Sequence, residues 1–220
     1  MKKIVDLSFH IEVGMPFFPS GKHTPFEVSK TCTIETAGRE IRKFTIGSHC
    51  GTHIDAFCHF IPGGLSIDEL PLNRVAGEAL LVNLAPLQPQ TVIEIDDIAG
   101  KMTDEKIEKL IIRTGWSKFW KTEQYFKDWP LLSNKCAKFI IEKGVKLLGL
   151  DFPSPDPAYK GKENEKDSPI HKLLFKNDVI LVEYLNNLAE LGEGKIFFSA
   201  IPLKLKDFDG SPVRAAGWRI

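Results

Sequence analysis

Residues 48–60 read Ser48-His49-Cys50-Gly51-Thr52-His53-Ile54-Asp55-Ala56-Phe57-Cys58-His59-Phe60 and hold three of the chain's six histidines. Side chains alternate between the two faces of an extended strand. A strand here would put His49, His53 and Asp55 on one face, with Gly51 leaving open space between the imidazoles. Imidazole and carboxylate groups together suit Zn²⁺ or Mn²⁺. Taken alone, the H-x-x-x-H-x-D spacing is weak evidence for a metal site, because surface histidines or a hydrogen-bonded His–Asp pair would also explain it.

The longer string H-x-G-T-H-x-D-x-x-x-H is more specific. It resembles the signature of the metal-dependent cyclase-like hydrolase family, which includes bacterial kynurenine formamidases and isatin hydrolases. Segments 114–117, 151–156 and 209–214 are also similar to that family, so the resemblance runs nearly from end to end. It implies an α/β fold: a single domain over residues 1–220, with a strand-rich, barrel-like core of the swivelling β/α type and peripheral helices.

The resemblance also implies a two-metal site. One ion would be held by His49, His53 and Asp55. Asp55 would bridge to a second ion, held also by His171 and Glu183, which have the family's spacing of twelve residues. His59 would act as a general acid/base instead of a ligand. The implied cofactor is Zn²⁺, as one or two ions, with Mn²⁺ as the alternative.

Glu183 attracts attention from the residues alone. It shares a face of the predicted strand 179–184 with Val179 and Leu181. A carboxylate buried among apolar side chains is costly unless a cation or hydrogen-bond donors compensate it. A metal ion would compensate it directly.

The chemistry that the resemblance implies is hydrolysis of an amide by a metal-bound hydroxide. A bound metal lowers the pKa of water to about 7, and His59 would protonate the leaving nitrogen near neutral pH. N-formylkynurenine, giving kynurenine and formate, is the first substrate to consider. The alternatives are a cyclic amide resembling isatin, a cyclase or lyase reaction on another carbonyl compound, and metal binding without turnover. The chain lacks the G-x-S-x-G motif of serine hydrolases.

Composition narrows the possible partners. The chain has 220 residues, 29 basic and 29 acidic, so a formal net charge of zero gives no support for nucleic-acid or membrane-surface binding. No apolar run approaches the roughly 20 residues needed to span a bilayer. Four cysteines show no C-x-x-C spacing. We therefore expect a cytoplasmic enzyme with a small-molecule amide substrate, and the resemblance adds a homodimer or homotetramer.

Local patterns predict the main elements. An antiparallel strand pair is expected at 26–34 and 41–46, joined at Gly38. Residues 95–110 have helical tendency, and Ser133 and Ser168 begin two further helices. Strands are expected at 4–8, 78–84, 110–113, 145–150, 179–184, 195–201 and 203–205, and after the turn at 209–214. The charged segment 160–166 is expected to be an exposed loop.

Six further positions carry open or weaker interpretations. Phe17 and Phe18 can offer rings to an aromatic substrate, or simply anchor their loop. His23 is interpreted as a solvated histidine. Trp116 either lines the pocket or packs in a turn. Asp151 either orients a ligand histidine or caps a turn. The family usually has Pro where this chain has Phe57, which puts the shape of the pocket in doubt.

Overall fold

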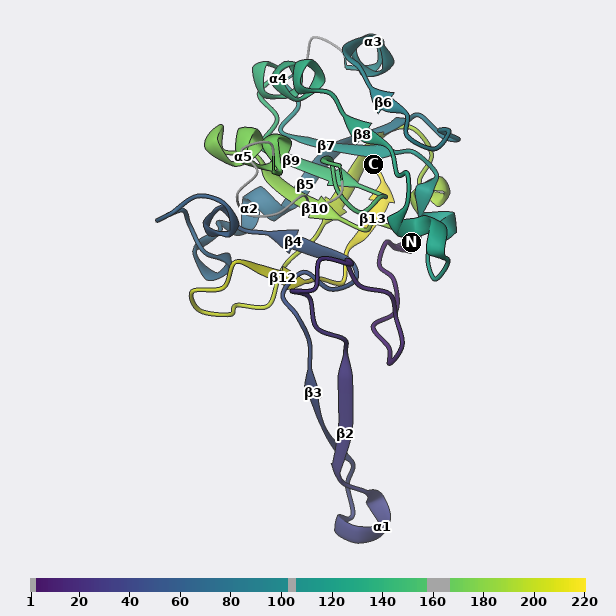
Figure 1. Cartoon of the computed structure of the whole chain (residues 1–220), viewed down its shortest axis with the longest axis vertical. Coiled ribbons are helices and arrows are strands. Elements are labelled where there is room, and N and C mark those ends of the chain that lie inside the picture. The colour runs from purple at the N-terminus through teal and green to yellow at the C-terminus, as the bar shows by residue number, and fades with distance from the viewer. Residues whose placement is uncertain (1–2, 103–105, 158–166) are drawn as a thin grey trace.

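A curled, open sheet of nine strands forms the core of the computed structural model, which describes residues 3–102, 106–157 and 167–220 (Figure 1). The strand order is β1-β13-β11-β5-β7-β9-β10-β4-β12. Their bounds are β1 Val5–Asp6, β4 His53–Asp55, β5 Ala76–Asn83, β7 Lys109–Arg113, β9 Leu147–Leu150, β10 Ile180–Glu183, β11 Gly194–Ser199, β12 Gly210–Pro212 and β13 Ala216–Arg219.

The four central strands, β5, β7, β9 and β10, run parallel. Leucine, isoleucine and valine dominate them, and β9 and β10 are buried along their whole length. Continuous apolar runs are typical of parallel strands that are covered on both faces. Glu183 ends such a run and is 5% exposed, so it is a carboxylate placed in the core by its strand.

The outer strands are antiparallel to their neighbours, and those beyond β10 build the site. β4 pairs with β10, which places His53 opposite Glu183. β12 pairs with the other edge of β4, which places Gly210 opposite Asp55. Residues far apart in the chain are thereby brought into one register around β4.

The helices are short, and α4 and α5 lie beside each other at one side of the sheet (Figure 1). The Ser133 hydroxyl accepts a hydrogen bond from the Cys136 amide at 3.0 Å and begins α4, as predicted. Pro169 occupies the first turn of α5 and places His171 there too. The α-helices are α1 Ile34–Ala37, α2 Leu72–Val75, α3 Ile95–Ile98, α4 Asn134–Glu142 and α5 Pro169–Lys176. Single-turn 3-10 helices lie at Phe57–His59, Ile67–Glu69, Ala99–Lys101, Trp116–Phe119, Glu123–Phe126 and Leu188–Glu190.

A hairpin extends away from the body of the molecule (Figure 1). It consists of β2 Glu27–Cys32 and β3 Ile41–Thr45, with α1 at its tip and Gly38 in the left-handed conformation behind that helix. We call β2, α1 and β3 the arm. All residues of β3, and all of β2 except Cys32, are exposed. Two further short strands, β6 Val92–Ile93 and β8 Leu131–Leu132, pair in parallel elsewhere.

The structure confirms the predicted α/β fold with a strand-rich core and peripheral helices, and the predicted antiparallel strand pair. Two element predictions are wrong in extent. The helical segment predicted at 95–110 ends at Lys101 among the described residues, and β7 begins at Lys109. Residues 203–205 form no strand; an isolated bridge between Pro202 and Val213 is the nearest pairing. The predicted loop at 160–166 lies outside the described residues.

No helix of the described part of the chain is long and apolar enough to cross a membrane.

Candidate active site

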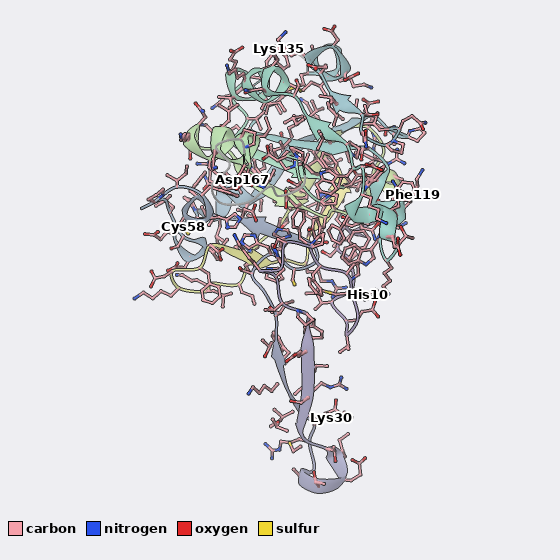
Figure 2. The ribbon with its side chains drawn as sticks, in the orientation of Figure 1. His10, Lys30, Cys58, Phe119, Lys135 and Asp167 are labelled. Carbon is pink, nitrogen blue, oxygen red and sulfur yellow. The ribbon has the colours of Figure 1, made fainter. Side chains whose placement is uncertain are left out.

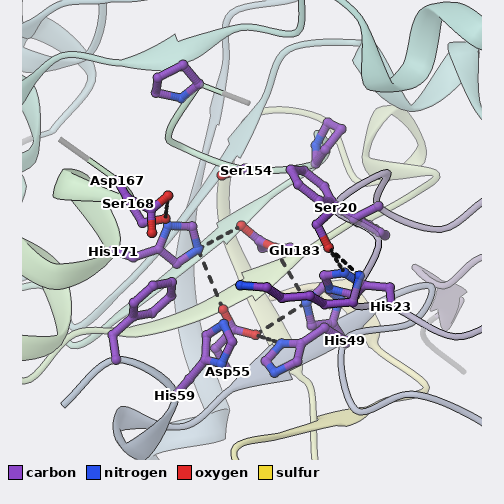
Figure 3. Close-up of a pocket in the computed structure, with 17 residues that line it drawn as sticks. Ser20, His23, His49, Asp55, His59, Ser154, Asp167, Ser168, His171 and Glu183 are labelled. Carbon is purple, nitrogen blue, oxygen red and sulfur yellow. Dashed lines mark hydrogen bonds and ion pairs between the residues drawn. The ribbon is translucent and has the colours of Figure 1, made fainter. Parts of the chain in front are cut away.

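The five predicted metal ligands converge on one cavity (Figure 3). β4 supplies His53 and Asp55, and β10 supplies Glu183. The first turn of α5 supplies His171, and the turn before β4 supplies His49. Three separate segments of the chain are therefore needed to assemble the cluster, because the turn that carries His49 leads directly into β4.

The predicted continuous strand across residues 49–55 is wrong, because only His53–Asp55 is extended. Gly51 has φ +60°, a left-handed conformation that favours glycine. The turn brings His49 to the same side as His53 and Asp55. Glycine is therefore favoured at position 51 by the backbone conformation, and not by a need for open space between the imidazole rings.

Asp55 lies at the centre of the cluster. Its Oδ1 lies 2.7 Å from His49 Nδ1 and 3.3 Å from His53 Nε2, and its Oδ2 lies 3.7 Å from His171 Nε2. Its two oxygens thus face different histidines, as an aspartate shared between two cations would require.

Glu183 contacts the Nε2 atoms of His53 and His171, and Figure 3 shows its contact with His171. Its carboxylate lies 3.4 Å from His53 Nε2 and 3.4 Å from His171 Nε2. The Oε1 atom is buried and makes no hydrogen bond among the described residues. A buried carboxylate oxygen that makes no hydrogen bond is costly, and a bound cation would compensate that cost.

The ring nitrogens that face away from Asp55 are each held by a hydrogen-bond acceptor. His53 Nδ1 lies 2.8 Å from the Gly51 carbonyl oxygen, and His171 Nδ1 lies 2.7 Å from Asp156 Oδ2. His49 Nε2 lies 2.9 Å from Asp209 Oδ2. Carbonyl and carboxylate oxygens accept, so each of these ring nitrogens donates. This arrangement is typical of metal-ligating histidines, because it fixes the ring and leaves the opposite nitrogen to the cation.

Burial and charge agree with a cation site. The five side chains belong to residues that are at most 9% exposed, and two of them are carboxylates. Burial raises the pKa of Glu183, and the negative charge of Asp55 raises it further. Burial disfavours the charged form of His49, but Asp55 and Asp209 outweigh this and raise its pKa to about 10. The cluster therefore favours positive charge, and its nitrogen and oxygen donors fit a divalent cation.

His59 differs from the ligand set in exposure. Its side chain is 28% exposed, against 10% or less for the five ligand candidates. Its ring centroid lies 4.0 Å from that of His49, and its Nδ1 lies 3.1 Å from Asp209 Oδ2. Burial lowers the pKa of His59, and the hydrogen bond to Asp209 opposes that shift. The ligand atoms of His49, Asp55 and His59 also lie within 4.8 Å of one another, so His59 is close enough to be a third metal ligand beside the other two.

The cavity above the cluster measures about 300 Å³. Beyond the cluster, its walls include Phe18, Phe60, Tyr184, Pro153 and Ser154. Phe18 therefore lies where the aromatic prediction placed it, whereas Phe17 is not part of the wall. Trp116 is 1% exposed and donates to the Tyr125 carbonyl oxygen at 3.0 Å, so it packs in a turn.

The interpretation of His23 as solvated is wrong. It is half-buried, lines the cavity and exchanges a hydrogen bond with Ser20 at 2.8 Å (Figure 3). Burial, helped by the nearby His49, lowers the pKa of His23 to about 4. The Pro/Gly-rich loop that precedes His23 forms part of the cavity wall. The composition of this loop predicts that His23 is exposed to solvent, and it does not predict that the loop covers the cavity.

The two roles proposed for Asp151 are now separated. Asp151 accepts hydrogen bonds from the Thr114 amide and hydroxyl and from the Gly115 amide, so it caps that turn. Asp156 is the residue that orients a candidate ligand histidine, His171. Phe57, the departure from the family pattern, is buried and packs edge-on against Phe175.

Two aspartates outside the predicted set therefore complete the site, Asp156 and Asp209. Both lie in segments whose similarity to the family was visible, 151–156 and 209–214. Their contacts arise between segments distant in sequence: 15 residues separate Asp156 from His171, and 160 separate Asp209 from His49.

A family model described as putative cyclase matches residues 5–157. The chain belongs to this family. The matched part contains His49, His53, Asp55 and His59, and ends before α5. The resemblance predicted from the sequence is confirmed.

Full-length relatives within the family carry a specific activity in their names. The kynurenine formamidase of Bacillus cereus is 32% identical over 212 residues, covering 96% of this chain and 95% of the relative. The kynurenine formamidase of Bacillus cytotoxicus is 33% identical over 193 residues, covering 87% of each.

Solved structures of this fold agree. A potential metal-dependent hydrolase with cyclase activity is 27% identical, with a TM-score of 0.77 and full coverage of both chains. Isatin hydrolase A from Labrenzia aggregata, bound to benzyl benzoate, has a TM-score of 0.85 at 23% identity, over 99% of this chain and 93% of that one. The second similarity establishes the fold.

Proposed function

We propose that this chain is a metal-dependent amidohydrolase that converts N-formylkynurenine to kynurenine and formate. The observation that carries the proposal is the buried cluster of three imidazoles and two carboxylates beside the more exposed His59, at the end of a cavity with aromatic walls. The comparisons bear out the broader prediction of a hydrolase acting on a C–N bond other than a peptide bond.

The cluster offers two sets of donors that share Asp55. His49, His53 and Asp55 would hold one ion, and Asp55, His171 and Glu183 a second. Zn²⁺ suits these nitrogen and oxygen donors best, and Mn²⁺ also accepts them. A divalent cation here would lower the pKa of water and polarise a carbonyl oxygen.

The chain's own residues supply the rest of the reaction. Water adds to the formyl carbon, the C–N bond breaks, and the departing nitrogen needs a proton. His59 is the more exposed imidazole beside the cluster and delivers that proton. Phe18 and Phe60 offer rings to the aromatic part of the substrate.

The test is formate release from N-formylkynurenine by chelator-stripped protein reloaded with Zn²⁺ or Mn²⁺. Asp55→Asn should remove turnover, while Asp207→Asn, an exposed acid on another loop, should retain it. Circular dichroism of both variants controls for folding. His59→Asn tests the proposed proton donor and leaves both sets of metal-ligand candidates unchanged. Product mass separates the alternatives, because hydrolysis adds one water and cyclodehydration removes one. Metal uptake without formate release would rule out N-formylkynurenine as the substrate.

We also propose that the arm joins two copies of this chain into a homodimer. A two-stranded hairpin is marginally stable in water by itself. Val28 and Phe44 form an apolar pair across the strands on one face of the arm and are 40% and 58% exposed, and the next pair on this face is Lys30 and Arg42. Paired copies related by a two-fold axis would bury both arms; a homotetramer would need a second such interface.

A cytoplasmic location completes the proposal. All four cysteines are unpaired, and Cys50 and Cys136 are buried. Free thiols are typical of proteins kept in a reducing compartment.

A further inference from the structure

Among the residues that the structure describes, Asp209 is the one carboxylate hydrogen-bonded to both a ligand candidate and the acid/base candidate. It immediately precedes β12, and its side chain is 43% exposed. A single oxygen, Oδ2, lies 2.9 Å from His49 Nε2 and 3.1 Å from His59 Nδ1. A carboxylate oxygen only accepts, so both imidazoles donate to it. The contact therefore specifies a proton on His59 Nδ1.

We propose that Asp209 is a positioning residue of this site: it holds His59 in the tautomer whose Nε2 carries no proton, and it ties that ring to His49. The catalytic part of this inference rests on the proposed function. A bare Nε2 takes a proton from the attacking water and then passes it to the departing nitrogen. The opposite tautomer would place the proton on Nε2 at the outset and leave His59 unable to act as the base.

The register of the sheet places Asp209 between the two histidines. β12 runs antiparallel to β4 with Gly210 opposite Asp55, and the Ala56 amide donates to the Asp209 carbonyl oxygen at 2.9 Å. His49 precedes β4, and His59 ends the 3-10 turn that follows it. One residue at the start of β12 can therefore reach the segments at both ends of β4.

Gly210 allows the close approach on which this depends. A Cβ atom at this position would lie 2.7 Å from His49 Cε1 and 3.0 Å from His49 Nε2. The imidazole thus lies directly against the backbone of β12. Any larger residue would push His49 away from the Asp209 carboxylate.

The shared carboxylate also explains how two imidazole rings can stand so near each other. Their centroids are 4.0 Å apart and their planes are inclined by 32°. Two imidazoles at this distance repel each other when both are charged, and a carboxylate between them offsets that repulsion. Asp209 consequently links the geometry of the ligand cluster to that of His59.

The direct test is the tautomer of His59 in metal-free protein, read from long-range ¹H–¹⁵N correlation spectra of ¹⁵N-histidine-labelled chain. Six histidines give few signals, and His59→Asn assigns the relevant one. In the wild type we expect the proton on Nδ1. Asp209→Ala should move it largely to Nε2, Asp209→Glu should restore it in part, and Asp207→Asn, on the same loop, should change nothing. Asp209→Ala is suited to this test because the side chain is half-exposed.

Activity provides the second readout. Loss of a correctly placed acid/base group costs roughly 10²–10⁴-fold in rate, so we expect Asp209→Ala to lower kcat by about 10²-fold with KM nearly unchanged, and Asp209→Glu to recover part of it. An unchanged His59 tautomer in Asp209→Ala overturns the inference, whatever the activity. A shifted tautomer in a protein that does not hydrolyse N-formylkynurenine supports the positioning role and overturns only the proposed substrate.

Discussion

His49, His53 and His171 each present one ring nitrogen to Asp55 and are held at the other by acceptors of different kinds. A backbone carbonyl holds His53, and carboxylates hold the other two. The backbone contact is local and survives side-chain substitution. The carboxylate contacts depend on Asp156 and Asp209, so these two aspartates are where the ligand geometry can be tested one residue at a time.

Asp156→Asn should weaken metal binding without removing a ligand. The variant loses the charged acceptor of His171 Nδ1, and losing such a partner typically costs about 10–100-fold in metal affinity. The measurement is a competition titration against a coloured chelator. The matched control is Asp151→Asn, five residues earlier, whose partners are Thr114 and Gly115. It should lower the free energy of unfolding by roughly 1–3 kcal/mol and leave metal affinity unchanged. Equal effects of the two variants on affinity would contradict the assignment.

At the scale of elements, the close contact between β12 and the turn before β4 decides whether the cluster closes. Gly210→Ala should therefore displace the His49 ring. We expect a loss of stability of about 1–3 kcal/mol from overpacking and a fall in metal affinity of at least about tenfold, as when a ligand's orientation is lost. Urea unfolding and chelator competition measure the two effects. Gly100→Ala, where no atom lies within 4 Å of the added methyl group, is the control and should bind metal like the wild type.

A second contact between elements predicts a dependence of stability on pH. Arg74 of α2 and Lys146, just before β9, both bind the carboxylate of Asp178, just before β10. Burial opposes ionisation of Asp178, but the hydrogen bonds from Lys146 and Arg74 outweigh it and lower its pKa below 3.8. A lowered folded-state pKa contributes stability above about pH 4, and this is lost as the pH falls through the folded-state value.

Asp178→Asn should therefore lower the free energy of unfolding at pH 7 by at most about 1 kcal/mol, because solvent screens these partly exposed groups. At pH 3 the difference from the wild type should shrink. Urea unfolding at both pH values measures it, and Asn tolerates the positive φ of +63° at this position. A difference that grows on acidification would refute the interpretation.

At the scale of the whole molecule, the arm projects away from the rest of the described chain. Figure 2 shows side chains around Lys30 extending outward from both of its strands. We expect the wild type to sediment as a dimer at micromolar concentration. Phe44→Glu should shift it towards monomer by placing a charge beside Val28 in the apolar pair of the arm. Lys43→Glu, on the neighbouring residue and the opposite face of β3, should leave the dimer intact. A monomeric wild type would exclude this interface.

The sequence by itself determined the family, the α/β class and the residue types of the cluster, because those depend on local spacing. His53 and Asp55, two residues apart on a short strand, share a face as expected, and His171 follows from the helix that Pro169 begins. Only the tertiary structure decided what holds each histidine, that His23 belongs to the cavity, and that Gly51 and Gly210 are required by conformation and close approach. The physical reason is that hydrogen bonds from Asp156 and Asp209 join segments paired by sheet register and helix placement, and no local pattern in the chain encodes which distant segment will lie against it.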